Sequence, residues 1–309
     1  MTDAPQTTVF SARRIVTMNP SNPVATHVAV REGRILGAGS LDELAVWGPH
    51  TLDESFAGHV LVPGFVEAHS HLMEGAMWAL PYLGYFPRKD PEGRLQGGLR
   101  TVDALIGRLR ELDAALADPE TPIVGWGFDP IYFEGARLVA RDLDRASGSR
   151  PILLLHASLH LATANTAMLR ASRITAETET EGVVKDAGGR PNGELQEMPA
   201  MMLTPALRTL AGLLGEEASY WRLGRQAVNG GVTTLTDLAS LAVLDPRRAE
   251  TSRRIAEDPA FPARLVHYCV PAMGSAPPDG AAIAERFLAL QATSTPKHRF
   301  GGIKIVADG

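Results

Sequence analysis

The sequence predicts an α/β protein that opens with a small β module and continues into a sheet of alternating strands and helices. Residues 7 to 62 carry short runs of β-branched residues broken by Gly, Asn and Pro. From "GVTTLTDLA" to "FGGIKIVADG", strand-like runs instead alternate with helical stretches. That alternation indicates a parallel sheet, either open or closed into a barrel. The intervening segment, residues 72 to 229, is too long for a simple loop and predicts an inserted lobe.

Bulk composition restricts the class of protein. The chain has 309 residues, of which 45% are hydrophobic and 21% charged, as in ordinary globular proteins. Its formal net charge of -5 gives no electrostatic basis for binding nucleic acid or an anionic membrane. No apolar run reaches the roughly 20 residues of a membrane span, and the first residues lack the apolar core of a signal peptide. Cys269 is the single cysteine, which excludes an intrachain disulfide and favours a cytoplasmic location.

In the β module, residues 1–60, the turn sequence "REGR" separates two apolar runs and predicts a hairpin. The module leads into "LVPGFVEAHSHLMEG", where we expect a buried strand to end at a pair of histidines. The second domain is expected to span residues 61–309.

Within the lobe, leucines at helical spacing in "TVDALIGRLRELDAALAD" predict a helix, with Thr101 as its N-cap. The runs "PIVGWGFD" and "PILLLHAS" predict strands, and "GVVKDAGGRPNGELQE" predicts a hairpin around Gly188 and Gly189. "EEASYWRLGRQAVNGG" predicts a helix that ends at Asn229 and Gly230. Beyond it, strands in "GVTTLTDLA", "ARLVHYCVP" and "FGGIKIVADG" alternate with helices in "RRAETSRRIAED" and "AAIAERFLALQAT".

His69 and His71 are the strongest candidates for chemistry. Residues two apart in a strand point to the same face, so both imidazoles project together at the end of the strand. Parallel α/β barrels keep their chemistry at such strand ends, and two imidazoles on one face are suitable ligands for Zn²⁺ or a similar ion. The alternative is a pair of surface histidines in a loop.

Several motifs carry a family resemblance across nearly the whole chain. "VPGFVEAHSHL" resembles the metal-binding signature of the amidohydrolase superfamily, and "ARRIVTMNP" with "HVAVREGRILGAG" resembles its N-terminal β-sandwich. "HASLHLATANTAML", "RPNGELQE", "GGVTTLTDLA" and "GGIKIVADG" resemble its family 3 branch, which includes N-substituted formamide deformylase. The resemblance implies a partial β-sandwich module followed by a TIM-like (β/α)8 barrel, with the large lobe inserted after the first barrel strand.

The resemblance also implies a metal site. His69 and His71 match the ligands of the first barrel strand, and Lys304 matches a lysine of the fourth, which in many members carries CO₂ as a carbamate between two metal ions. The expected cofactor is one or two divalent ions, with zinc the first choice. A lysine between Ile303 and Ile305 is costly to bury as a free cation, which agrees with a ligand role, although an exposed edge position is the alternative. We expect both isoleucines to face the helix layer.

Other candidates have two interpretations each. Glu197 is an alternative metal ligand or a structural residue, and His160 is either a substrate-binding residue or a core histidine. Trp126 is the aromatic candidate for substrate binding. The lobe carries a set of large side chains that form either core or pocket, namely Met73, Met77, Trp78, Tyr82, Tyr85, Phe86, Trp126, Phe128, Tyr132 and Phe133. As a pocket, the set suits an apolar or aromatic N-substituent.

The family pattern also calls for histidines on the fifth and sixth barrel strands and an aspartate on the eighth, and the sequence stops at Gly309, after about four strands. We therefore expect an N-terminal fragment of a hydrolase that attacks amide- or formamide-type C–N bonds with metal-activated water, inactive by itself. The alternative is a degenerate relative that acts as a binding or partner protein. The expected partners are a small-molecule substrate and, in the intact enzyme, further copies of the chain.

Overall fold

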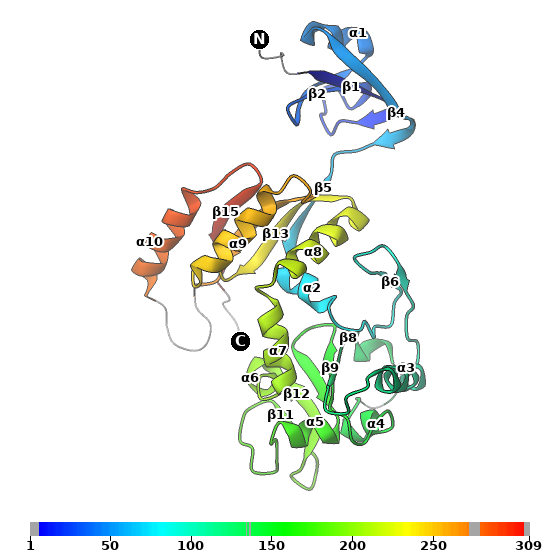
Figure 1. Cartoon of the computed structure of the whole chain (residues 1–309), viewed down its shortest axis with the longest axis vertical. Coiled ribbons are helices and arrows are strands. Elements are labelled where there is room, and N and C mark those ends of the chain that lie inside the picture. Colours follow the sequence, from blue (N-terminus) through cyan, green and yellow to red (C-terminus); the bar gives the residue numbers. More distant parts are fainter. Residues whose placement is uncertain (1–5, 134, 136, 272–278, 306–309) are drawn as a thin grey trace. The chain divides into compact units, whose positions relative to one another are not determined.

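The structure is a computed structural model that describes residues 6–133, 135, 137–271 and 279–305, apart from the side chains of residues 209 and 211 (Figure 1). It is a mixed α/β protein with several sheets. Contacts divide the chain into two units, Met1–Phe65 and Val66–Gly309, where the sequence placed the boundary after residue 60. No helix among the described residues is both long and apolar enough to cross a membrane.

The first unit contains one four-stranded sheet in the order β3-β2-β1-β4, formed by β1 (Thr7–Val16), β2 (Val24–Arg31), β3 (Arg34–Gly39) and β4 (His50–Leu61). Arg31 pairs with Arg34 across the predicted turn, and Gly33 supplies the positive φ of 72° that the turn needs.

Residues 41–47 correct the sequence prediction, which had only strands in this module. They form α1 (Leu41–Leu44) and the short helix η1 (Ala45–Trp47). Ser40 and Glu43 form a capping box, because the Ser40 hydroxyl accepts from the Glu43 amide while the Glu43 carboxylate accepts from the Ser40 amide. Leu44 then packs on Val9 and Ala29, so among the described residues a helix, rather than a second sheet, covers this side.

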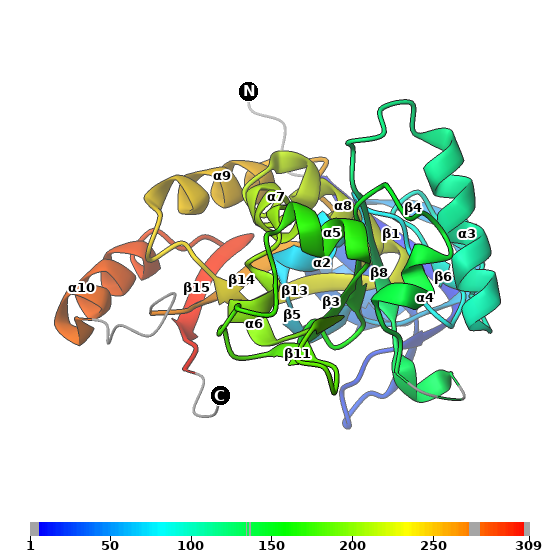
Figure 2. The same ribbon diagram turned by 90° about the horizontal axis from the view of Figure 1, so that it is seen from below.

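The second unit contains a four-stranded sheet in the order β15-β14-β13-β5. Its strands are β5 (Phe65–Ser70), β13 (Val232–Ser240), β14 (Arg264–Cys269) and β15 (His298–Ile303), and the last three pair in parallel. The helices α8 (Glu217–Gly230), α9 (Pro246–Glu257) and α10 (Gly280–Gln291) lie along it (Figures 1 and 2). The predicted order of strands and helices in this part of the chain is confirmed. Helix α8 ends at Gly230, as predicted, and the left-handed Gly231 follows as its C-cap.

Two apolar clusters fasten these helices to the sheet. Leu223 of α8, Leu235 of β13 and Ile255 of α9 belong to one cluster. Cys269 of β14 and Phe287 of α10 belong to the other, and this cysteine is buried. The sheet therefore has one well-packed helical face.

The prediction of a buried strand before the histidines is wrong. Strand β5 is at the edge of the sheet, and Phe65 and Val66 are 60% and 65% exposed. Of its residues only Ser70 is buried, and its hydroxyl donates to the Thr236 carbonyl at 3.0 Å. Apolar composition had suggested burial, but an edge strand has a neighbour on one side only.

The segment from residue 72 to 229 holds a five-stranded sheet in the order β11-β12-β10-β9-β8. Its strands are β8 (Ile123–Phe128), β9 (Ile152–His156), β10 (Leu161–Ala164), β11 (Val183–Lys185) and β12 (Pro191–Gln196). A small hairpin pairs β6 (Arg88–Lys89) with β7 (Leu95–Gln96). Strands β8 and β9 run parallel, whereas β10 is antiparallel to β9 and to β12. The carboxyl ends of β8, β9 and β12 therefore point to the same end of this sheet.

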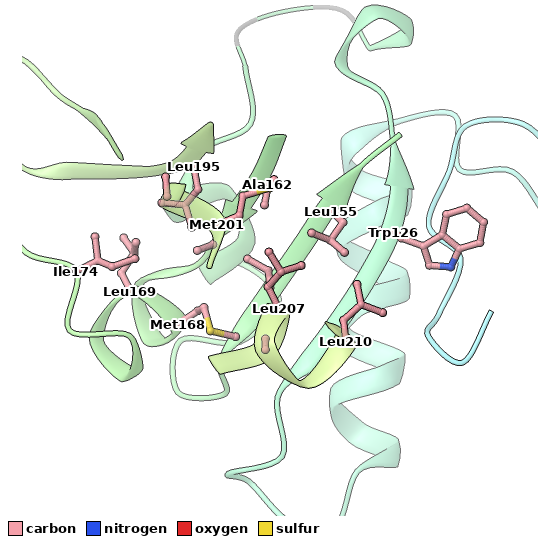
Figure 3. Close-up of a cluster of buried hydrophobic side chains, with 14 of the residues drawn as sticks. Trp126, Leu155, Ala162, Met168, Leu169, Ile174, Leu195, Met201, Leu207 and Leu210 are labelled. Carbon is pink, nitrogen blue, oxygen red and sulfur yellow. The ribbon is translucent and has the colours of Figure 1, made fainter. Parts of the chain in front are cut away.

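The helices of this segment are α2 (Leu72–Met77), α3 (Val102–Ala115), η2 (Pro130–Tyr132), α4 (Ala140–Asp144), α5 (Thr166–Ala171), α6 (Glu197–Met201) and α7 (Pro205–Leu213). Helix α3 begins as predicted, with Thr101 accepting from the Ala104 amide. Leu155, Ala162 and Leu195 of the sheet meet Met168 of α5 and Leu207 of α7 in the largest apolar cluster (Figure 3).

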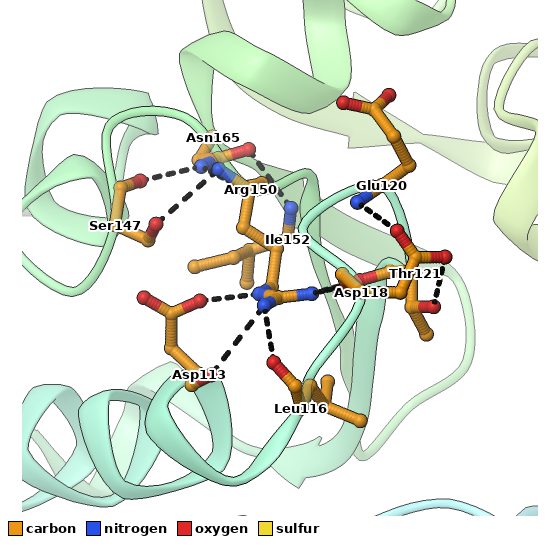
Figure 4. Close-up of polar contacts among 9 residues, drawn as sticks. All are labelled: Asp113, Leu116, Asp118, Glu120, Thr121, Ser147, Arg150, Ile152 and Asn165. Atoms are coloured by element: carbon orange, nitrogen blue, oxygen red, sulfur yellow. Dashed lines mark hydrogen bonds and ion pairs between the residues drawn. The ribbon is translucent and has the colours of Figure 1, made fainter.

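Arg150 ties the α3 end of the lobe to the start of β9 (Figure 4). Its side chain is buried and forms an ion pair with Asp113. The guanidinium also donates to the carbonyls of Leu116 and Thr121 at 2.9 and 2.8 Å. Because several fixed acceptors surround this cation, its desolvation is compensated.

Helix α2 is anchored by its close approach to α8. A Cβ atom on Gly75 would lie 2.0 Å from the Ser219 carbonyl oxygen, so glycine at this position lets the two backbones meet. Since α2 starts directly after His71, its packing on α8 determines where that histidine lies.

Candidate metal centre and adjoining pocket

His69 and His71 converge at the end of β5. Their Nε2 atoms are 3.3 Å apart, and the ring centroids are 5.1 Å apart. His69 is exposed, whereas His71 is partly buried. Burial lowers the pKa of His71; Asp237 opposes that effect, and His69 and Lys304 add to it. Both rings therefore present ring nitrogens to one point, as the two-residue spacing predicts.

The spacing of these nitrogens fits a divalent ion. Zinc binds imidazole nitrogen at about 2.0–2.1 Å in tetrahedral geometry, which separates two ligand nitrogens by about 3.3–3.4 Å. Among the described residues, no third His, Cys, Asp or Glu completes a group with this pair. The donor set is thus two neutral nitrogen ligands, and metal binding stays a prediction.

Asp237 and His267 lie behind His71. An Asp237 carboxylate oxygen is 4.0 Å from His71 Nδ1, and its other oxygen is 3.6 Å from His267 Nδ1. Asp237 and His267 are paired residues of the parallel strands β13 and β14, and both are buried. The carboxylate faces the ring nitrogen that a metal-bound His71 would use to donate a proton, which is the usual outer partner of a ligating histidine.

Lys304 directly follows β15, and its amide donates to the Cys269 carbonyl at 2.8 Å. The residue is partly buried. Its positive charge contributes to the lowered pKa of His71, but less than burial and the neighbouring His69 do. Ile305 is 74% exposed, so the expectation that it faces the helix layer is wrong, because the strand ends at Ile303. Lys304 acts electrostatically on His71, and its role as a ligand stays a prediction.

Glu74 and Arg88 connect the histidines to the lobe. The Glu74 carboxylate accepts from the His71 amide at 3.2 Å. Although Glu74 keeps contact with solvent, surrounding atoms desolvate its carboxyl and raise its pKa, against the effects of the His71 amide and of Arg88. The guanidinium carbon of Arg88 lies 6.0 Å from the Tyr82 ring centroid and 5.6 Å from that of Trp126. Arg88 is therefore within electrostatic range of Glu74 and in contact with the lobe's aromatic residues.

The aromatic residues surround a pocket of about 370 Å³, which is within the size range of small-molecule sites. It lies at the carboxyl ends of β8 and β9, since Trp126, Gly127 and Ala157 contribute to its wall. Of the predicted aromatic set, five residues line it, namely Tyr82, Tyr85, Phe86, Trp126 and Tyr132. Phe128 and Met77 are core instead. The set is thus divided between core and pocket.

Glycines of β8 allow residues 81–84 to lie against the strand and form the pocket wall. Tyr82 pairs with Trp126, and the Leu83 amide donates to the Trp126 carbonyl at 2.7 Å. Gly127 has φ 97°, and a Cβ there would lie 2.6 Å from the Tyr82 ring. The sequence "GWGF" therefore supplies both the aromatic surface and the space beside it.

His160 and Glu197 form a separate pair at the same end of the lobe sheet, where β8, β9 and β12 end. His160 Nδ1 is 2.9 Å from a Glu197 carboxylate oxygen, and the Glu197 amide donates to the His160 carbonyl at 2.7 Å. Both side chains are exposed. Glu197 and Leu159 have φ of 60°, a left-handed conformation that is uncommon for such residues. Within the described part of the chain this pair joins no third potential ligand, and roles in metal or substrate binding stay predictions.

Sequence reasoning placed the histidines and Trp126 but missed the partners that surround them. His267 and Arg88 carried no motif, and the Asp237 carboxylate also accepts from the Ala239 amide at 3.1 Å within its own turn. The one available signal was the position of Asp237 and His267 inside two successive predicted strands.

Comparison with known proteins gives a consistent family. The profile of amidohydrolase family 3 matches residues 56–309. The chain is 28% identical to the putative amidohydrolase YtcJ of Bacillus subtilis (strain 168), over 96% of this chain and 53% of that protein. It is 30% identical to the N-substituted formamide deformylase of Arthrobacter pascens, over 62% of this chain and 34% of that protein. It is also 27% identical to the protein LONG AFTER FAR-RED 3 of Arabidopsis thaliana, over 72% of this chain and 37% of that protein.

Two solved structures share the fold. An uncharacterized metal-dependent hydrolase from Pyrococcus horikoshii OT3 matches with a TM-score of 0.56 at 15% identity, over 96% of this chain and 54% of that one. One from Pyrococcus furiosus matches with a TM-score of 0.53, also at 15% identity, over 96% and 55%. The chain therefore spans about half the length of these structures, and about half or less of the curated relatives it matches.

Proposed function

This chain belongs to amidohydrolase family 3, and from that premise we propose that the protein is a metal-dependent hydrolase of amide- or formamide-type C–N bonds in a small N-substituted substrate. The observation that carries the proposal is the 3.3 Å convergence of the Nε2 atoms of His69 and His71. The proposal concerns the whole protein, because the chain covers about half of its relatives.

The four-stranded sheet is proposed to be the first part of a (β/α)8 barrel. Its strands follow in chain order from β5 to β15, and each later strand is preceded by a helix. The histidines end β5, at the carboxyl edge where barrel enzymes keep their sites. The exposed apolar residues Phe65 and Val66 lie on an edge strand that a closed barrel would cover.

The chain's own residues have distinct roles in this proposal. His69 and His71 hold a divalent ion, with zinc the first choice, and Asp237 keeps the His71 ring oriented through its Nδ1 side. When bound, such an ion supplies an activated water and polarisation of the substrate carbonyl. Lys304 is proposed to join them as a carbamate, because that modification changes its charge from positive to negative. The pocket of Tyr82 and Trp126 receives the N-substituent.

Metal content and binding test the proposal. The purified protein is expected to bind Zn²⁺ or Co²⁺ in calorimetric titration, and His69→Ala and His71→Ala should each weaken binding by at least about tenfold. His59→Ala is the matched control, because His59 is exposed and, among the described residues, forms no side-chain hydrogen bond or ion pair.

Activity is tested with N-substituted formamides and amides that carry an aromatic group. We expect turnover by the whole protein that depends on metal and is lost in His69→Ala. A stable, monodisperse protein that binds no metal would support the alternative, a non-catalytic relative that acts as a binding protein.

A further inference from the structure

Arg88 is a cation on the pocket wall whose hydrogen-bond donors are unused. Among the described residues, no hydrogen bond or ion pair within 4 Å involves its side chain, although it interacts electrostatically with Glu74. Its position is instead maintained by the faces of the Tyr82 and Trp126 rings. A guanidinium held through a cation–π contact keeps its in-plane N–H groups available.

Other residues of the pocket do not neutralise this charge. Asp129 also lines the wall, but its carboxylate accepts from the Ile131 amide at 3.1 Å and forms no ion pair with Arg88. The remaining lining residues named above are aromatic or small. The pocket therefore combines an apolar surface with one planar cation and one carboxylate, which form no ion pair with each other among the described residues.

We propose that this pocket binds an aromatic or apolar group that ends in a carboxylate, with the ring against Trp126 and the carboxylate bound by Arg88. A carboxylate matches the paired N–H groups of a guanidinium and forms two parallel hydrogen bonds with it. The inference rests on the proposed function for the chemistry, and it narrows the substrate class to acylated aromatic amines or amino acids that carry a carboxylate.

The position of Arg88 explains why the carboxylate would matter for the reaction. Arg88 is within electrostatic range of Glu74, whose carboxylate accepts from the His71 amide. A substrate anchored at Arg88 is therefore held near Glu74, and in this proposal its scissile amide extends from the pocket toward His69 and His71. Arg88 acts here as a specificity-determining residue rather than a catalytic one.

The test compares two probes of nearly equal shape, N-acetylphenylalanine and its neutral amide, titrated into the purified protein by calorimetry. We expect the carboxylate to bind at least about tenfold more tightly, since a charge-assisted pair has no counterpart in the amide. Arg88→Gln should remove this preference, and Arg88→Lys should retain only part of it because lysine lacks the planar fork.

Arg100→Gln is the matched control. Arg100 also lies over aromatic rings of the pocket, 4.3 Å from the Tyr85 centroid and 5.4 Å from that of Phe86, but it does not line the pocket. The carboxylate preference should survive this substitution. Equal binding of the two probes, binding of neither, or a preference that persists in Arg88→Gln would each overturn the inference.

His69→Ala separates this inference from the proposed function. If the pocket binds the carboxylate as described, the preference should persist in this variant although its metal binding is weakened. A protein that selects the carboxylate but binds no metal would refute the proposed function alone, whereas a metal-dependent hydrolase without carboxylate preference would refute this inference alone.

Discussion

Replacing Gly75 with alanine should disturb both the stability of the protein and its metal site. The new Cβ would lie 2.0 Å from the Ser219 carbonyl oxygen and 3.1 Å from the Leu223 amide nitrogen, whereas ordinary contacts begin at 3.4 Å. Backbone atoms cannot rotate away as side chains can, so α2 and α8 must separate by about 1.4 Å at this point. We expect a loss of about 1–3 kcal/mol in the free energy of unfolding, the usual cost of overpacking.

The same shift should reach the histidines. Helix α2 begins directly after His71, and the Glu74 carboxylate accepts from the His71 amide. The two Nε2 atoms match the nitrogen spacing of a tetrahedral ion to within a few tenths of an ångström, so a displacement near 1 Å removes that match. Zinc affinity should fall by about tenfold or more, while His69 and His71 themselves are unchanged.

Gly107→Ala is the matched control in this experiment. Gly107 lies inside α3, and a Cβ there would have nothing within 4 Å. This substitution should raise the free energy of unfolding by roughly 0.5–1 kcal/mol, because alanine loses less conformational entropy in a helix. Denaturant titration and zinc calorimetry measure both variants. A Gly75→Ala protein with the stability and zinc affinity of the parent would refute the reasoning from this helix contact.

Three further outcomes are expected. Burial lowers the pKa of His156 to about 4 and of His298 to about 3. Between about pH 6.5 and 5, only the unfolded state then takes up protons at these histidines. The free energy of unfolding should therefore fall by about 1.5 kcal/mol per histidine over that range. If the slope of unfolding free energy against pH were unchanged in His298→Gln, this explanation would be contradicted. Arg150→Met should lower the free energy of unfolding by about 3–5 kcal/mol, because it leaves buried acceptors unpaired. The exposed Arg108→Met should lower it by less than about 0.5 kcal/mol. Comparable losses for the two variants in denaturant titrations would exclude that explanation. Residues 1–309 alone should hydrolyse N-acyl or N-formyl amines negligibly, and robust metal-dependent turnover abolished by His69→Ala would disprove this.

Local features of the fold were predictable because neighbouring residues encode them. Thr101 caps its helix, Gly33 makes its turn, and "PIVGWGFD" forms a strand, each through interactions within a few residues. The convergence of His69 and His71 belongs to the same class, since it follows from the two-residue period of a strand.

Sequence patterns failed where the outcome depended on packing against distant parts of the chain. Composition suggested that β5 is buried, but burial depends on what packs on a strand, and this one is at a sheet edge. At residues 41–47 the opposite happened, because a local signal for a helix was present but strands were predicted. That signal is the capping pair of Ser40 and Glu43.

By itself the sequence determined the family, the order of strands and helices in most of the chain, and a pair of imidazoles on one face. Only the tertiary structure decided what surrounds that pair. Asp237 lies beside His71, and His267 beside Asp237, on strands more than a hundred residues from that histidine. Arg88 meets Trp126 because residues 81–84 lie along β8. Such contacts depend on how closely whole elements approach, as at Gly75 and Gly127, where the absence of a side chain permits the contact but does not specify the partner.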